Sequence, residues 1–234
     1  MLNINSRNLC ALLQYALVAS LDRIKIGNQR CRQWAAGALL VLVALPGSAA
    51  SLLVMGDSLS AAYGLNDTSQ GWVALLEERL DARNPTVTVI NASISGETTR
   101  GGMNRLPALL ERYQPEYVMI ELGGNDGLQG QNIADIRARL QTMIDDAQDS
   151  GADVILLGIR IPPNYGPRYT EPFFAQFSEL AEENDIEYFL PFMLEGVADN
   201  PDMMQSDGIH PTAAAQTRIL ENVWEILPEA LTTP

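Results

Sequence analysis

Short apolar runs alternate with longer amphipathic segments along most of the chain. The apolar runs are nearly continuous and rich in Val, Ile and Leu, as is typical of parallel strands covered on both faces. Five of them predict strands, at 52–56, 87–93, 117–123, 153–159 and 186–192. The amphipathic segments predict helices at 71–82, 102–113, 132–149 and 171–184, and a last helix is expected after Pro211, a residue that suits a first helical position. This alternation predicts right-handed βαβ units in a three-layer α/β domain.

Small and polar residues follow the carboxyl ends of the predicted strands. These segments are Gly56-Asp57-Ser58, Gly96 within NASISGETT, Gly123-Gly124-Asn125-Asp126 and, after the last strand and a loop, SDGIHP at 206–211. Each segment alone is also typical of an ordinary turn, or of a helix start capped by Asp207. Because ligands of open parallel sheets bind beyond the carboxyl ends of the strands, the four segments together predict a site at that edge.

Three of these residues have the chemistry of acyl transfer. Ser58 is a candidate nucleophile, but a free hydroxyl needs a base at neutral pH. His210 is the only histidine in the chain, so a histidine base has to be this residue. Asp207 precedes it by three residues across a glycine-containing turn, a spacing that lets a carboxylate hold the far ring nitrogen. The sequence therefore predicts a Ser58–His210–Asp207 triad.

An oxyanion that forms on the substrate needs donors placed in advance. The Ser58 backbone N–H, the Gly96 backbone N–H and the Asn125 side-chain amide are the candidates, although Gly96 also suits a turn that requires a positive φ. Asp57 is interpreted mainly as an organiser of the loop. The G-x-S-x-G pattern of another class of serine hydrolase is absent around Ser58.

The amino-terminal segment has a different composition. Five of the fifteen basic residues lie within 1–33, followed by the apolar run WAAGALLVLVAL and the small residues of PGSAA. This order is typical of a secretory signal, and the apolar run is shorter than the ~20 residues that span a bilayer. We therefore expect an extension at 1–50 cleaved near Ala50, a domain at 51–234, and a periplasmic or secreted product without stable membrane insertion. A buried core helix is the alternative, and a second apolar patch at 9–20 leaves the translation start open.

Charge and cysteine content narrow the possible partners. Residues 51–234 carry ten arginines, no lysine and 28 acidic residues, a net charge of −18. This argues against nucleic acid as a partner and against electrostatic docking on anionic lipid. A solvated acidic surface explains the charge, with salt adaptation as the other interpretation. Both cysteines, Cys10 and Cys31, lie in the predicted extension, so the domain has no thiol nucleophile, no disulfide and no zinc site made of Cys and His.

Four segments resemble the sequence blocks of one known family. GDSLS at 56–60, SISGETT around Gly96, GGNDG at 123–127 and DGIHP at 207–211 are similar to the blocks of the SGNH, or GDSL, hydrolases, in the same order. MGDSLSAAYGL, INASISGETT, IELGGNDGLQG and IRIPPNYGPRY resemble its periplasmic acyl-CoA thioesterase, lysophospholipase and arylesterase branch. The resemblance implies a flavodoxin-like α/β/α sandwich with sheet order 2-1-3-4-5. It also implies Ser58, Asp207 and His210 as the triad, Ser58, Gly96 and Asn125 as the oxyanion hole, and no metal or organic cofactor.

The same resemblance implies small acyl esters or thioesters as substrates, and we expect a monomer. The loop IPPNYGPRYTEPFF is rich in Pro, Tyr and Phe, which predicts an acyl-binding wall that includes Ile161, Pro162 and Tyr165, with Leu128 beside it. Ordinary packing of this loop is the alternative. Arg160 and Arg168 suit either an anionic head group or plain solvation.

Two other functions are compatible with the sequence. One is a carbohydrate acetyl esterase with the same triad, although the sequence shows no evident aromatics for sugar stacking. The other is a flavodoxin-like module that binds a nucleotide or flavin, although residues 51–234 contain neither G-x-G-x-x-G nor a Gly-Lys-Ser/Thr phosphate cradle.

Overall fold

A five-stranded parallel sheet is the middle layer of the domain. A computed structural model describes residues 50–234, and the predicted signal segment lies outside the described residues. The strands are β1 (Ser51–Gly56), β2 (Thr88–Asn91), β3 (Tyr117–Glu121), β4 (Asp153–Leu157) and β5 (Tyr188–Leu190). Their spatial order is β2-β1-β3-β4-β5, with every neighbouring pair parallel. The predicted fold class and sheet order are confirmed.

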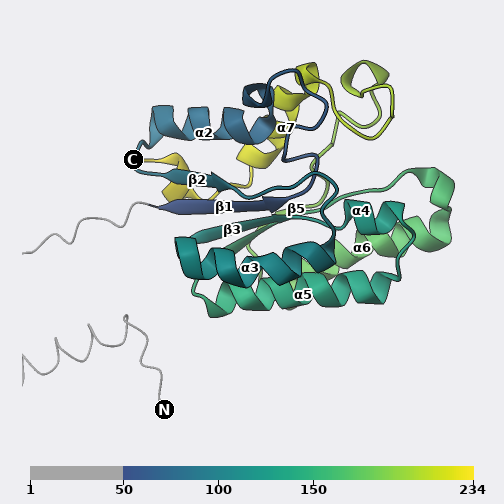
Figure 1. The fold of residues 1–234 in the computed structure, drawn as a ribbon, viewed down its shortest axis with the longest axis horizontal. Coiled ribbons are helices and arrows are strands. Elements are labelled where there is room, and N and C mark those ends of the chain that lie inside the picture. Colours follow the sequence, from purple (N-terminus) through teal and green to yellow (C-terminus); the bar gives the residue numbers. More distant parts are fainter. Residues whose placement is uncertain (1–49) are drawn as a thin grey trace, which may run out of the picture. The chain divides into compact units, whose positions relative to one another are not determined.

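Helices cover both faces of this sheet (Figure 1). On one side lie α3 (Thr99–Tyr113), α4 (Gly124–Leu128), α5 (Ile133–Asp149) and α6 (Pro167–Glu183). On the other side lie α2 (Trp72–Arg83) and α7 (Gln216–Trp224), and the short α8 (Glu229–Thr232) follows. None of the helices within residues 50–234 is both long and apolar enough to cross a membrane.

Two separate hydrophobic clusters hold the three layers together. Successive strand residues point to opposite faces, and here both faces are apolar. Leu53 and Met55 of β1 pack with α3, α5 and α6, whereas Leu52 and Val54 pack with α2 and α7. This explains why the strands are continuous apolar runs rather than alternating ones.

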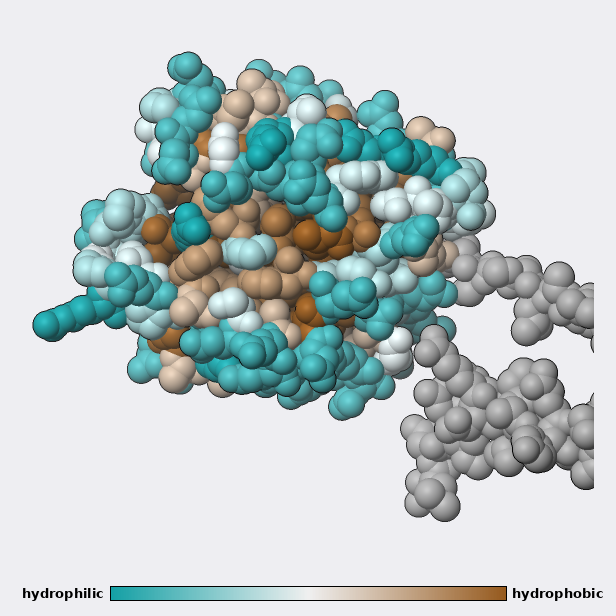
Figure 2. Space-filling model, turned by 180° about the vertical axis from the view of Figure 1, so that it is seen from behind, coloured by the Kyte–Doolittle hydropathy of each residue, from teal (hydrophilic) through white to brown (hydrophobic). Residues whose placement is uncertain are grey.

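The two edge strands are less buried than the three central ones, and β2 has exposed residues at both ends. Tyr188, Phe189 and Leu190 are each only half-buried. From behind, hydrophobic surface forms a band between hydrophilic surface above and below it (Figure 2). The hydrophilic surface above and below the band belongs to helices whose outer sides are polar.

Some element boundaries differ from those that the sequence predicts. Strands β2 to β5 end two residues earlier than their apolar runs, because buried residues such as Leu122 and Ile159 continue into the loops after the last ladder hydrogen bond. The short helix α4 was predicted as loop, since two glycines make GNDGL a poor helix former. A helical region does follow Pro211, as predicted, but Pro211 is not its first residue: it pairs with Met204 in an isolated bridge, and helical structure begins at Ala213.

Candidate active site

Ser58, His210 and Asp207 form a continuous hydrogen-bonded chain. Ser58 lies two residues past the end of β1, and its Oγ is 2.9 Å from His210 Nε2. His210 Nδ1 is 2.7 Å from Asp207 Oδ2. Because the carboxylate only accepts, we assign the ring proton to Nδ1, which leaves Nε2 to accept from the Ser58 hydroxyl. The sequence-predicted triad residues are thus brought together in the order that proton transfer requires.

A tight turn places Asp207 and His210 in contact. Asp207 Oδ1 accepts the backbone N–H groups of Ile209, at 2.9 Å, and His210, at 3.0 Å. Gly208, with φ of 68°, provides the left-handed residue in this turn. Burial raises the pKa of Asp207, but these hydrogen bonds and the one from the His210 ring outweigh it and lower the pKa to about 2. Asp207 is therefore ionised at neutral pH, and its carboxylate orients the His210 ring.

Gln205 ties the histidine loop to the serine loop. Its side-chain amide donates to the carbonyl oxygens of Tyr63, at 3.0 Å, and Pro211, at 2.9 Å, while its backbone N–H donates to His210 O. The Tyr63 ring lies against the His210 ring, with centroids 4.5 Å apart. Two segments 142 residues apart are fixed relative to each other by one amide, which the sequence pattern did not indicate.

Two of the three predicted oxyanion donors are free. Within residues 50–234, the backbone N–H groups of Ser58 and Gly96 donate to no protein acceptor. Gly96 has a φ of 81°, and a Cβ added there would meet nothing within 4 Å, so the approach to its N–H is open. The Asn125 amide is different, because its Nδ2 donates to Asp57 Oδ2 and to Glu97 O, each at 2.9 Å. Asn125 reaches an oxyanion only by exchanging one of these contacts.

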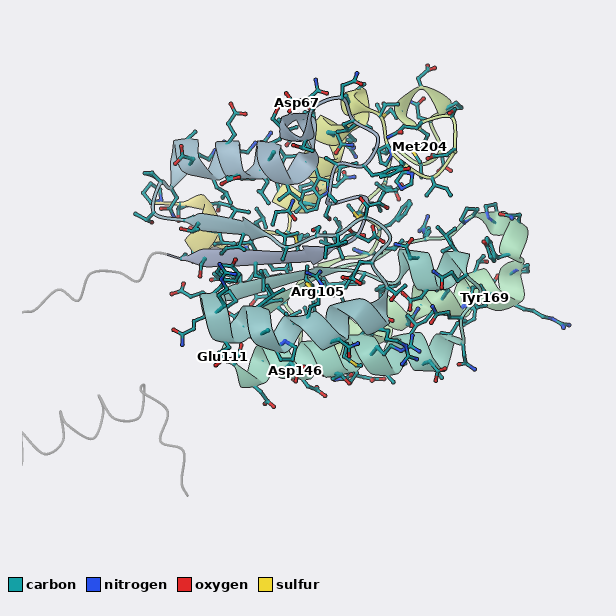
Figure 3. The ribbon with its side chains drawn as sticks, viewed as in Figure 1. Asp67, Arg105, Glu111, Asp146, Tyr169 and Met204 are labelled. Carbon is teal, nitrogen blue, oxygen red and sulfur yellow. The ribbon has the colours of Figure 1, made fainter. Side chains whose placement is uncertain are left out.

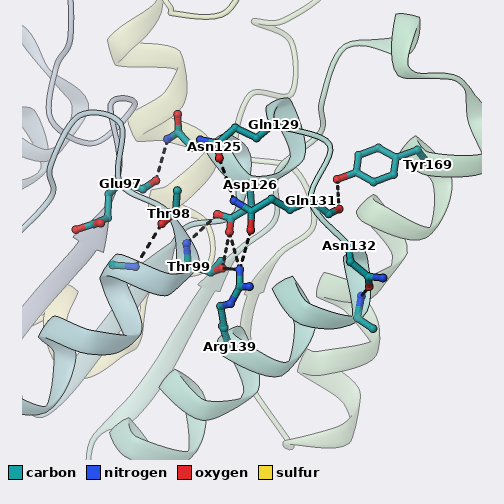
Figure 4. Close-up of polar contacts among 12 residues, drawn as sticks. Glu97, Thr98, Thr99, Asn125, Asp126, Gln129, Gln131, Asn132, Arg139 and Tyr169 are labelled. Carbon is teal, nitrogen blue, oxygen red and sulfur yellow. Dashed lines mark hydrogen bonds and ion pairs between the residues drawn. The ribbon is translucent and has the colours of Figure 1, made fainter.

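A buried polar cluster around Asp126 joins helices α3, α4 and α5 (Figure 4). Asp126 is fully buried and accepts from the Thr99 backbone N–H at 2.8 Å and the Thr99 hydroxyl at 2.7 Å. Arg139 Nη1 on α5 donates to Asp126 at 3.2 Å and to Gln131 at 2.8 Å. Asp126 thereby caps α3 from α4 and fixes the β2–α3 loop beside Asn125.

Two acidic side chains lie beneath the serine loop. Asp57 is 2 % exposed, accepts the Leu59 N–H at 3.0 Å and holds Asn125, which agrees with its predicted role as loop organiser. Glu121, fully buried at the end of β3, accepts from the Ser60 hydroxyl at 2.7 Å and the Asp57 N–H at 3.3 Å.

Burial raises the pKa of Asp57 to about 6, although the hydrogen bond from Leu59 and the charge of His210 act to lower it. Burial and the neighbouring Asp57 raise the pKa of Glu121 well above its usual value.

We expect a pH-dependent stability difference between the wild type and Asp57→Asn. Between pH 4 and 6 the folded state holds a proton on Asp57 that the unfolded chain has released, so stability is lost as pH rises through about 6. A shift from 3.8 to about 6 corresponds to about 3 kcal/mol. Urea unfolding of both proteins at intervals from pH 4 to 7 measures this difference, and a gap that stays constant with pH would contradict it.

A pocket of about 640 Å³ opens at the triad. Ser58 and His210 lie in its wall together with three of the predicted acyl-binding residues, Leu128, Ile161 and Pro162. Tyr165 is not part of the lining; its hydroxyl donates to the Leu128 carbonyl at 2.6 Å and braces that wall from outside. Met204 lies on one of the loops that gather at this end of the domain (Figure 3) and also lines the pocket.

Several lining residues were not predicted from the sequence. They include Phe192, Leu194 and Asp199, whereas Arg160 and the loop that ends at Phe174 were among the candidates drawn from the sequence. Phe192 belongs to an apolar stretch that packing alone explains, so no pattern distinguished it. Glu121 was also missed, although a carboxyl within the apolar run YVMIELG is an available signal. No group of three or more His, Cys, Asp or Glu side chains within residues 50–234 is arranged to bind a metal.

The site has a serine, a histidine and a carboxylate in one hydrogen-bonded chain. This arrangement, at the carboxyl edge of a flavodoxin-like sheet, is that of a serine hydrolase. The sequence model of the GDSL-like lipase/acylhydrolase family matches residues 54–218. The chain belongs to this family, and the resemblance seen in its four sequence blocks is confirmed.

Named relatives and solved structures agree with this assignment. Esterase TesA of Pseudomonas aeruginosa is 53% identical over 192 residues, covering 82% of this chain and 94% of that protein. Thioesterase 1/protease 1/lysophospholipase L1 of Escherichia coli strain K12 is 44% identical over 78% of this chain and 86% of its own length. A crystal structure of TesA matches with a TM-score of 0.74 and 54% identity, over 77% of this chain and 99% of that one.

Proposed function

We propose that this protein hydrolyses acyl esters and thioesters of medium or long chain through an acyl-enzyme on Ser58. The single observation that carries the proposal is the Ser58–His210–Asp207 chain at the mouth of a largely apolar pocket. Esterase and thioesterase names among the relatives support the same chemistry.

In the first half of the reaction, Ser58 Oγ attacks the acyl carbon while its proton moves to His210 Nε2. The ionised Asp207 stabilises the imidazolium that forms. Negative charge develops on the former carbonyl oxygen, and the free N–H groups of Ser58 and Gly96 are the donors for it. The tetrahedral intermediate then collapses, the bond to the alcohol or thiol breaks, and His210 Nε2 returns the proton to that leaving group.

In the second half, a water molecule attacks the acyl-enzyme and gives a proton to His210 Nε2. Collapse releases the carboxylic acid, and Ser58 Oγ recovers a proton from His210. Asn125 joins the donors when it exchanges the Glu97 carbonyl for the oxyanion, while Asp57 keeps the amide in place.

The surface around the pocket supports a substrate with an apolar chain. Four large hydrophobic side chains within residues 50–234 are exposed: Tyr63, Ile94, Tyr165 and Ile209. All four follow the carboxyl ends of strands, three of them in loops and Tyr165 in a short 3-10 helix (Pro163–Tyr165), and Tyr63 packs on His210 itself. Exposed apolar side chains that gather on one surface mark binding regions, and the apolar side chains of Leu128, Ile161 and Phe174 in the adjoining pocket suit an acyl chain.

A chain-length series tests the proposal. Matched acyl esters and acyl thioesters from two to sixteen or so carbons are offered to the purified protein, with Ser58→Ala as the blank. We expect kcat/KM to rise by at least ~10-fold from acetyl to medium chains, because each buried methylene contributes about 0.8 kcal/mol. Turnover of acetyl esters alone would contradict the acyl-chain assignment and favour a carbohydrate acetyl esterase.

Location and assembly rest on the sequence alone. We propose export to the periplasm or the medium from the signal-like pattern of residues 1–50, of which 1–49 lie outside the described residues. The expected monomer also stays a prediction.

A further inference from the structure

Arg160 has an unusual setting for an exposed arginine. It lies three residues past the end of β4, between the buried Ile159 and Ile161, and lines the same pocket as Ser58. Its guanidinium carbon is 4.3 Å from the ring centroid of Phe174 and 4.6 Å from that of Phe192. Two aromatic rings thus hold the planar group in the pocket wall, where a solvated arginine would sample many rotamers.

The same guanidinium lacks a protein anion. Four other arginines (Arg79, Arg105, Arg137 and Arg139) form ion pairs with carboxylates. Among residues 50–234, no carboxylate oxygen lies within 4.0 Å of Arg160, and its N–H groups donate to no protein acceptor. A fixed, unpaired fork of N–H donors is the arrangement that binds a phosphate or carboxylate oxyanion.

The charges around Arg160 limit how much negative charge it accepts. The other ionisable lining residues besides His210 are the acids Asp57, Glu171 and Asp199. Residues 51–234 together carry a net charge of −18, which repels polyanions at long range. One anionic group next to Arg160 is therefore tolerated, whereas a ligand with several phosphates meets a carboxylate-lined wall.

We propose that Arg160 is a specificity-determining residue that binds a single phosphate in the alcohol part of an acyl ester. This inference rests on the proposed ester hydrolysis and adds a preference within it: lysophospholipids, with one phosphodiester, over acyl-CoA, with several phosphates. The preference follows from one phosphate beside Arg160 and from the acidic residues around it. A monoacylglycerol is the uncharged counterpart of the favoured substrate.

The test compares two arginine variants of the full-length protein. Arg160→Met keeps a long apolar stem against the two rings and removes the charge. Arg168→Met removes the same charge from an exposed position that does not line the pocket. Both are assayed on lysophosphatidylcholine, monoacylglycerol and acyl-CoA with one acyl chain length, below the concentration at which each substrate aggregates.

We expect the ratio of kcat/KM for lysophosphatidylcholine to that for monoacylglycerol to fall by at least ~10-fold in Arg160→Met, chiefly through KM, as loss of a charge-assisted hydrogen-bonded pair predicts. Arg168→Met leaves the ratio unchanged. Glycerophosphocholine, used as an inhibitor of monoacylglycerol hydrolysis, loses at least ~10-fold in potency in Arg160→Met only.

Other outcomes overturn the inference in distinguishable ways. An unchanged ratio in Arg160→Met shows that Arg160 only shapes the pocket, while the ester function stands. A larger loss on acyl-CoA than on lysophosphatidylcholine assigns the anchor to the coenzyme's phosphates and contradicts the single-phosphate preference. Wild-type protein that hydrolyses none of the three substrates refutes the proposed function, and the inference falls with it.

Discussion

Ser58→Ala is expected to lower kcat on an acyl ester by about 10⁴- to 10⁶-fold. The hydroxyl is the atom that attacks, and its hydrogen bond is to His210, so its removal eliminates the covalent route and leaves little else changed. The residual rate reflects the Ser58 and Gly96 N–H donors and substrate binding. Steady-state hydrolysis of one chromogenic acyl ester measures the loss, with circular dichroism and the urea midpoint as checks on the fold.

A double variant gives this prediction its control. Because Ser58 and His210 act as one unit, Ser58→Ala with His210→Ala is expected to cost about as much as Ser58→Ala alone. Losses that multiply in the double variant, or a single variant that keeps more than about a hundredth of the wild-type kcat, would contradict a shared role in one catalytic unit.

Asp126→Ala is expected to have the largest effect on stability, a loss of about 3–5 kcal/mol in the free energy of unfolding. The fully buried carboxylate neutralises Arg139 and accepts two hydrogen bonds from Thr99. Alanine leaves the Thr99 N–H and hydroxyl without this acceptor, and it leaves the charge of Arg139 without a counter-ion, with Gln131 as the remaining acceptor. Since Thr99 begins α3 directly after the loop with Gly96 and Glu97, kcat falls as well. Urea unfolding followed by tryptophan fluorescence measures the stability.

The surface pair of Arg79 and Glu221 is the matched control. Its 2.6 Å contact is shorter than that of Asp126 and Arg139, but both side chains are partly exposed. Glu221→Ala is therefore expected to cost less than about 1 kcal/mol. If Glu221→Ala and Asp126→Ala lowered the free energy of unfolding by similar amounts, burial would not explain how much each ion pair contributes to stability.

Much of the fold follows from the sequence because the strands are buried on both faces. Leu52 to Met55 read as one apolar run since alternate residues enter two different cores. Strand ends are less predictable: Leu122 and Ile159 are as apolar as strand residues, yet they pack beyond the last ladder bond. Helix α4 depends on Asp126 and its tertiary partners, which local propensity does not encode.

For the site, convergence at one sheet edge made Ser58, Gly96, Asn125, Asp207 and His210 recognisable. What the sequence could not indicate are contacts between distant segments. Gln205 binds Tyr63 O across 142 residues, Glu121 supports the serine loop from a neighbouring strand, and Arg160 stacks between rings from two other elements. These contacts depend on how distant segments pack. The triad was easier to predict, because this chain has a single histidine and few other residues that could take its roles.

The most direct test of the central claim is covalent labelling with a fluorophosphonate, followed by peptide mass spectrometry. An activated serine attacks phosphorus and expels fluoride, and the oxyanion donors stabilise the adduct. We expect one adduct per chain, on Ser58, with labelling slowed by at least ~10³-fold in His210→Ala. An adduct on another residue, or equally fast labelling of Ser58 without His210, would contradict the claim that this histidine activates this serine.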